Sequence, residues 1–228
     1  MTTQHEMAHR VAEPAELGVG MRFSLHPHCD DFVDVILGAL RDAEQAGLTD
    51  GLVTSTDDVS TYVGATTGPA EQRLARYLAG VVAAAAGRTP TGHVVAHVLL
   101  SRGCPGERTC DLAVTRLPRP AAVDVPATGV RAVAQWSLYP LLDAGSHAGS
   151  DAGDGHGDHM RHITDAIERA RQRGTATEPR HYATRLSGDL ADVLATAVDA
   201  WAAVGSEVPH VVTHLTVSVG SPSAGSER

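Results

Sequence analysis

The chain has 228 residues, a formal net charge of −9 and three cysteines. The acidic balance argues against nucleic acid and anionic membranes as partners, and no apolar run approaches the roughly 20 residues that a membrane-spanning helix needs. The 18 residues counted as Lys plus Arg are all arginine, which excludes Schiff-base chemistry, a P-loop lysine and a lysine general base. Three cysteines without a framework pattern, and no apolar signal-peptide core, predict reduced thiols in the cytoplasm.

The first half of the chain has the periodicity of two helices and four short strands. Strands are marked by alternation of apolar and polar residues, and helices by apolar stripes spaced three and four residues apart. Before them, we expect residues 1–18 to form a disordered polar arm. The predicted elements are a strand at 21–26, a helix capped by Asp30 or Asp31 with a stripe of Phe32, Val33, Ile36, Leu37 and Leu40 that ends at Gly47, strands at 52–56 and 59–63, a helix from Pro69 to Gly87, and a strand at 93–101.

The second half has the same order of elements. We predict strands at 132–139, 175–178, 182–186 and 210–219, a helix at 158–173 with Met160 on its apolar stripe, and a helix from the cap Asp189 to Gly205. The Pro-containing segment 108–130 is the expected linker. Residues 143–157 are Gly, Ala, Ser, Asp and His without apolar periodicity, which predicts a mobile insertion, and 224–228 form a tail.

Short segments recur between the halves. Phe23–Pro27 returns as Trp136–Pro140, and His93–His97 returns as His210–His214. Such duplication, with the element order βαββαβ in each half, is typical of the ferredoxin-like motif. We therefore predict an α+β protein built as a tandem repeat of two ferredoxin-like domains, at 19–107 and 131–223, with antiparallel sheets and helices on one face. The half-polar bare faces should stack on another sheet, within the chain or across a dimer.

Three groups of residues have the composition of a metal or nucleophile site. His26–Asp31 holds two His, a Cys and two Asp, but the repeat at 139–142 keeps none of them, which favours a strand end and helix cap. The His-rich tract 147–162 favours a solvated insertion, because a flexible loop loses much entropy on forming a site. Cys104 is matched by Ser221 without an accompanying His–Asp pair, which favours a tight turn. We predict no catalytic residue and no metal site.

Matched polar residues on the strands are the binding candidates that the repeat singles out. Ser24 and Ser137 hold equivalent places on the first strands, beside Thr61 and Thr184 on the neighbouring third strands. Their hydroxyls could hydrogen-bond a small ring or each other. His97 and His214 are the best-matched histidines, and they serve either packing or a site that both halves contain.

Several of these segments resemble the YkoF family of thiamine/hydroxymethylpyrimidine-binding proteins, over roughly residues 18 to 223. His26 and His28-Cys29 stand where the family pattern has Tyr and Met-Thr around Pro27, and the insertion 143–157 lies beside the matching region of the second domain. Both departures bear on affinity and pyrimidine preference. The matching segments are Arg22–Leu25 with Pro27, Asp30–Leu40, Ser60-Thr61, Gly103–Gly106, Ser137–Pro140, His181–Ala183, Gly188-Asp189 and Ser221–Ser223.

The resemblance implies two domains that dimerise and each bind thiamine or its hydroxymethylpyrimidine moiety, in uptake or salvage, without catalysis and without a cofactor. A transporter component is then a candidate partner, whereas nucleic acid and membrane insertion are not expected. An aminopyrimidine needs acceptors for its amine, a donor to a ring nitrogen and a flat wall, for which Tyr139 and Tyr182 are candidates. We predict that the sites use Ser24, Asp31, Asp57, Ser60 and Thr61 in the first domain and Ser137, Tyr139, His181, Tyr182 and Thr184 in the second.

Two other classes of function compete with a binding protein. One is a ligand-sensing regulatory module that acts through a protein partner, which fold analogy alone supports. The other is an enzyme of thiamine metabolism. The two halves share no acid/base or nucleophile set, which argues against this alternative.

Overall fold

The computed structural model describes residue 14 and residues 17–103, 117–141 and 158–223. Nearly all of the predicted arm, the whole insertion 143–157, the tail, and the cysteines Cys104 and Cys110 lie outside these residues. Within them the chain forms an α+β structure of four helices and eight strands. In chain order they are β1 Gly20–Pro27, α1 Phe32–Gln45, β2 Leu52–Thr56, β3 Thr61–Ala65, α2 Ala70–Arg88, β4 Val94–Arg102, β5 Arg131–Leu141, α3 Asp158–Gln172, β6 Ala176–Arg180, β7 Ala183–Asp189, α4 Leu190–Val204 and β8 His210–Val219.

All eight strands belong to one antiparallel sheet, in the order β2-β3-β1-β4-β8-β5-β7-β6. The halves meet where β4 pairs with β8, from Val94 opposite Val219 to Arg102 opposite Val211. The expected stacking of one sheet on another within the chain is therefore wrong for the described residues. Pairing the two edges satisfies backbone groups that would otherwise stay open to water or to another chain.

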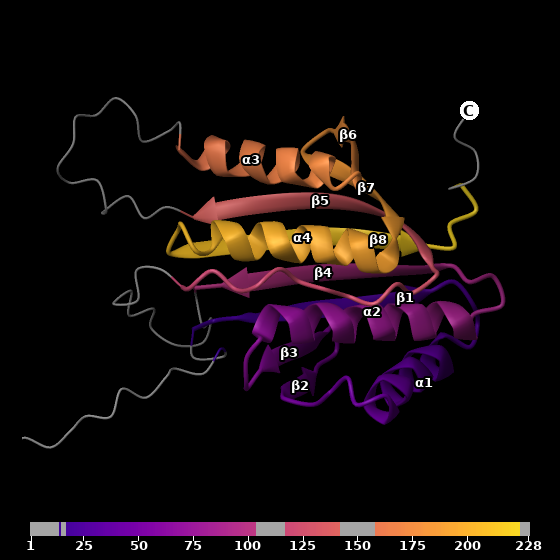
Figure 1. Ribbon diagram of the computed structural model, residues 1–228. Coiled ribbons are helices and arrows are strands. Elements are labelled where there is room, and N and C mark those ends of the chain that lie inside the picture. Colours follow the sequence, from indigo (N-terminus) through magenta and orange to yellow (C-terminus); the bar gives the residue numbers. More distant parts are fainter. Residues whose placement is uncertain (1–13, 15–16, 104–116, 142–157, 224–228) are drawn as a thin grey trace, which may run out of the picture.

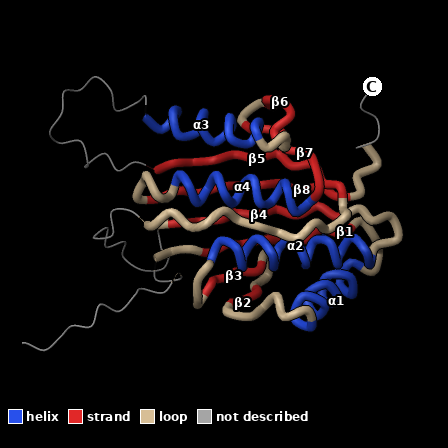
Figure 2. Tube along the Cα trace, in the orientation of Figure 1, coloured by secondary structure: helices blue, strands red, loops and turns tan. Residues whose placement is uncertain are grey.

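The four described helices lie on one side of the sheet, and the other side is left open (Figures 1 and 2). Strand residues alternate accordingly: on β4, Val94, Ala96 and Val98 are buried against the helices, while His97 and Leu99 are exposed. We call the side without helices the open face. None of the helices in the described ranges combines the length and apolarity needed to cross a bilayer.

Two predicted strands begin later than the alternation suggested, because local turns take their first residues. Asp57 Oδ1 accepts hydrogen bonds from the backbone nitrogens of Val59 and Ser60, each at 2.9 Å, so β3 starts at Thr61. Tyr182 has φ 63° and forms the turn before β7. A side-chain-to-backbone turn of this kind competes with the strand ladder.

The first helix buries a different face from the predicted one. Phe32, Val33 and Leu37 are about half exposed, whereas Ala39 and Ala43 are buried. Small residues on the inner face let the helix approach its neighbours closely, and a hydrophobicity pattern cannot distinguish that face from a stripe of larger residues. Met160 of α3 is likewise exposed rather than part of the core.

The segment 117–130, here called the strap, runs across the helix layer between the halves (Figure 2). Gln72 accepts from the Asp124 backbone nitrogen at 2.7 Å, and Asp189 accepts from Thr128 and Gly129. Asp189 also accepts from the Ala191 nitrogen at 2.8 Å, which confirms it as the cap of α4. The strap covers α4, which explains why nearly all of that helix is buried.

Candidate functional site on the open face

The polar residues that the repeat singled out meet at the centre of the open face. In the strand register Ser24 of β1 lies opposite His97 of β4, and Ser137 of β5 lies opposite His214 of β8. Each half therefore contributes one serine–histidine pair. The two histidine rings lie nearly parallel, with centroids 6.5 Å apart. The matched pairs sit on either side of the β4–β8 junction, so the two halves share one continuous face, which also exposes Leu99.

Further histidines extend this surface on the first half. His26 packs edge-on against His97 with centroids 5.2 Å apart, and its Nε2 lies 3.0 Å from Ser24 Oγ. His28 stacks on His93 at 4.0 Å. In the part of the chain that the structure covers, His, Cys, Asp and Glu side chains form no group of three that could hold a metal ion. Among the described residues, these histidines make ring–ring contacts and hydrogen bonds.

The local environment keeps several of these rings neutral. Burial, followed by the neighbouring His97 and His28, lowers the pKa of His26 below 6.5. Burial and His97 lower the pKa of His214, and burial and His28 lower that of His93. A neutral imidazole offers one donor and one acceptor, so near pH 7 these three rings can hydrogen-bond a polar ligand without adding positive charge to the face.

A cavity of about 420 Å³ opens on this face in the second half. Its volume falls in the range of small-molecule sites, roughly 300–1,000 Å³. Gln135 supplies an amide with both a carbonyl acceptor and an amine donor, the pattern that an aminopyrimidine edge complements. Hydroxyl groups and a guanidinium surround it. The lining residues are Val133, Ala134, Gln135, Arg185, Thr216, Ser218, Ser221 and Ser223.

The equivalent corner of the first half contains an ion pair instead. By the repeat, Arg22 is the counterpart of Gln135, and its Nη1 donates to Asp57 Oδ2 at 2.6 Å and to Ser60 Oγ at 2.9 Å. The Arg22 hydrogen bond and the backbone N–H groups of Ser60 and Val59 lower the pKa of Asp57 to about 2. Asp57 and Ser60, both predicted site residues, are thus brought together and held by a third residue that sequence reasoning missed.

Ser137, Tyr139 and Tyr182 lie toward one end of the second half. Ser137 Oγ donates to the Tyr182 carbonyl at 3.0 Å. Tyr139 is half exposed on β5, whereas Tyr182 is fully exposed on the turn that precedes β7. His181 is exposed on the same turn. Tyr139 therefore presents a ring beside Ser137, and Tyr182 contributes its backbone.

Thr61 and Thr184 lie on the other side of the sheet from the serines. They pair in register with Phe23 and Trp136, and both threonines are buried toward the helices. Of the two alternatives for these hydroxyls, a hydrogen bond between the serines and the threonines is therefore wrong, because neighbouring residues of a strand point to opposite faces. Asp31 is exposed at the start of α1 and its side chain makes no cap hydrogen bond.

The structure thus unites only part of the predicted set and adds residues to it. His97 and His214, which repeat matching had already marked, belong beside Ser24 and Ser137. Gln135 alternates in phase with Ser137 and Tyr139 on β5, so strand alternation is a sequence signal that could have found it. Arg185 and Ser218 join the surface through pairing of distant strands. The binding role of the ten predicted residues stays a prediction.

Comparison with known proteins agrees with the repeated segments. The family model described as "YKOF-related Family" matches residues 18–107 and 153–224. The chain belongs to this family. It is also 29% identical, over 207 residues, to a Bacillus subtilis (strain 168) protein named "Putative HMP/thiamine-binding protein YkoF". That similarity spans 90% of this chain and 91% of the Bacillus protein, so both halves are included. The YkoF-family resemblance seen in the sequence is confirmed.

Proposed function

We propose that this protein binds thiamine or its hydroxymethylpyrimidine moiety without converting it, and serves uptake or salvage of the vitamin. The observation that carries the proposal is the similarity to the Bacillus protein over 90% of this chain, because that protein is named for HMP and thiamine binding. Each half is inferred to be a ferredoxin-like unit, since the order βαββαβ occurs twice. A homodimer and a transporter component remain the proposed partners.

The open face supports this ligand class chemically. The cavity around Gln135 offers an amide and several hydroxyls, which suit the amine and ring nitrogens of an aminopyrimidine. The neutral histidines beside it do not oppose the thiazolium cation. The proposed binding residues are Ser137, Tyr139 and Gln135 in the second half and Ser24 with Asp57 and Ser60 in the first.

Isothermal titration calorimetry with thiamine and with hydroxymethylpyrimidine tests the proposal. We expect saturable heat with at least one ligand, and recovery of unchanged ligand by chromatography after long incubation. Gln135→Leu keeps the side chain's approximate size but removes both amide groups, so it should weaken binding. Gln172→Leu, on exposed α3, is the matched control and should bind normally.

Each outcome has a distinct reading. Absence of heat and of any thermal shift with both ligands would reject the proposal for this chain. Conversion of either ligand into a product would replace it with an enzymatic role. Binding that is unchanged in Gln135→Leu and weakened in Ser24→Ala would place the site in the first half.

A further inference from the structure

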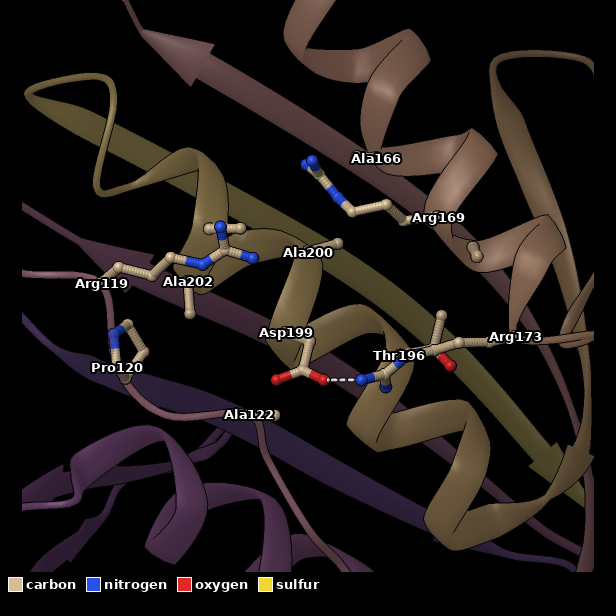
Figure 3. Close-up of a pocket in the computed structure, with 12 residues that line it drawn as sticks. Arg119, Pro120, Ala122, Ala166, Arg169, Arg173, Thr196, Asp199, Ala200 and Ala202 are labelled. Carbon is tan, nitrogen blue, oxygen red and sulfur yellow. Dashed lines mark hydrogen bonds and ion pairs between the residues drawn. The ribbon is translucent and has the colours of Figure 1, made fainter.

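A second cavity lies on the helix side of the sheet and is lined by three arginines (Figure 3). Arg119 comes from the strap, Arg169 from α3, Arg173 from the turn after α3, and Asp199 from α4. Its volume is about 130 Å³, well above the roughly 10–15 Å³ that holds one water molecule. We call it the arginine cavity. Its small apolar lining residues are Ala122, Ala166, Ala170, Ala200, Ala202 and Ala203.

The charges that line the arginine cavity do not cancel. Asp199 is already engaged: its Oδ1 accepts the Val123 backbone N–H at 2.6 Å and its Oδ2 pairs with Arg173. The side chains of Arg119 and Arg169 form no hydrogen bond or ion pair with any residue that the structure describes. In Figure 3 their guanidinium groups extend toward one another from opposite sides of α4. Among the described lining residues, three arginines and one aspartate therefore leave an excess of two positive charges, in a protein whose net charge is −9.

One atom in this arrangement lacks a partner although it is buried. Arg169 Nε is shielded from solvent and has no hydrogen-bond acceptor. A buried polar group on a charged side chain is costly to leave unpaired. An acceptor supplied by a bound anion would remove that deficit.

The repeat shows that the arginine cavity is peculiar to the second half. Alignment of the glycines that end α1 and α3, Gly47 and Gly174, puts Asp42 at the position of Arg169. Asp42 forms two hydrogen bonds with Arg88, at 2.8 and 2.6 Å. At this position the first half thus pairs its charge within the chain. A site that serves both halves alike would not differ in this way.

We propose that the arginine cavity binds a small phosphate-type dianion. Guanidinium groups match the oxygens of phosphate in geometry and charge, often with two parallel hydrogen bonds, and two unpaired arginines match two negative charges. The alanine lining leaves room for the ligand. This site is separate from the vitamin site proposed above, because the two cavities lie on opposite sides of the sheet and are lined by different residues.

Titration calorimetry at constant ionic strength, with inorganic phosphate, pyrophosphate, phenyl phosphate and acetate, tests this inference. We expect one phosphate-type anion per chain and little heat with acetate. Arg119→Gln and Arg169→Gln should each weaken the affinity at least about tenfold, the loss expected for one charge-assisted hydrogen-bonding group. Arg41→Gln, at an exposed position on α1, is the control and should leave the affinity unchanged.

Arg119 lies on the strap rather than in a helix, so its variant keeps the test valid if Arg169→Gln unfolds. Phenyl phosphate binding more tightly than inorganic phosphate identifies an organic phosphate as the ligand source, and the reverse order identifies free phosphate. Absence of binding by all three phosphates overturns the inference. Equal loss in Arg41→Gln, or acetate binding as tightly as pyrophosphate, also overturns it. Arg119→Gln should give the same result with thiamine as the unmodified chain does. The phosphate proposal and the vitamin proposal can therefore fail independently.

Discussion

The helix pairs α1–α2 and α3–α4 occupy equivalent places in the two halves, but different side-chain interactions join the helices of each pair. In the first half, Asp42 of α1 and Arg88 of α2 form a two-point ion pair across the helices. Gly38 makes room for it, since a Cβ there would lie 2.5 Å from Arg88 Nη1. In the second half, Arg169 stands at the position of Asp42 and has no acceptor for its Nε. The α1–α2 pair is therefore joined by an ion pair, whereas a cavity lined by arginines lies beside α3 and α4.

The difference shows which positions of a duplicated fold are constrained. Ala39 and Ala43 of α1 correspond to Ala166 and Ala170 of α3, and all four are at most 2% exposed. Close packing leaves no freedom at these inner positions. Residues at the rim of the helix pair contact solvent, so each half could acquire its own charges there.

The largest expected effect comes from an ion pair that exists only in the first half. Arg102 Nε donates to Glu71 Oε1 at 3.0 Å, with both side chains at most 7% exposed, and Arg102 also donates to the Ala202 carbonyl of α4. Glu71→Ala should reduce the free energy of unfolding by about 3–5 kcal/mol, because a buried charge loses its partner. Urea denaturation followed by circular dichroism measures the change.

The double variant Glu71→Leu/Arg102→Met sharpens this test. It removes both charges and keeps apolar volume, so it should recover most of the lost stability. A single-variant loss below about 1 kcal/mol, as for an exposed pair, would contradict the assigned burial.

The two halves should respond alike to substitution of a glycine that follows the last strand of each half. At both positions the backbone closely approaches the backbone of the other half. Gly103 has φ 97° and a Cβ there would lie 1.9 Å from the Pro209 carbonyl oxygen, while Gly220 has φ 61° and would clash with Gly92 at 2.3 Å. Each Gly→Ala change should cost at least about 1–3 kcal/mol from backbone strain alone. Thermal unfolding of the two variants measures it. Gly87→Ala, with no neighbour within 4 Å of the added Cβ, is the control and should not destabilise.

The first half should also respond more strongly to acid. The folded-state pKa values of His26 and His93 lie below 6.5, so the folded protein binds fewer protons than the unfolded chain between those values and 6.5. The stability they contribute is complete above pH 6.5 and is lost as pH falls through the lowered pKa values. The hydrogen-exchange protection factors, which correct for the intrinsic exchange rate at each pH, should therefore fall below pH 6.5 more on β1 and β4 than on β5.

Replacing His26 by the residue at its repeat position tests the cause. His26→Tyr, after Tyr139, should reduce the acid sensitivity of β1, whereas His181→Tyr on an exposed turn should not. An equal loss of protection on all three strands would contradict the assignment to these histidines.

The smallest effect concerns a single carboxyl group. The pKa of Asp57 is lowered from 3.8 to about 2, first by the Arg22 hydrogen bond. Its contribution to stability is present above pH 3.8 and disappears as pH falls toward 2. In Arg22→Gln the pKa should rise toward 3.8, measured by carbon-13 NMR of the carboxyl group. Arg131→Gln, exposed on β5, is the control, and an unchanged Asp57 pKa in Arg22→Gln would contradict this cause.

The sequence by itself determined the elements and their duplication. Predicted strands at 52–56 and 210–219 coincide with β2 and β8, and Asp189 caps α4 as expected. These features depend on periodicity and on residues within a few positions of each other, which are visible along the chain. The matched serines and histidines were visible for the same reason.

Only the tertiary structure decided how those parts combine. Pairing of β4 with β8 joined the two halves into one sheet with one continuous open face. It also placed the ring centroids of His97 and His214 6.5 Å apart. Packing also turned the small residues of α1 inward and left Arg169 without an acceptor. These outcomes depend on contacts between segments far apart in sequence. The free energies of such contacts cannot be predicted from a local sequence pattern.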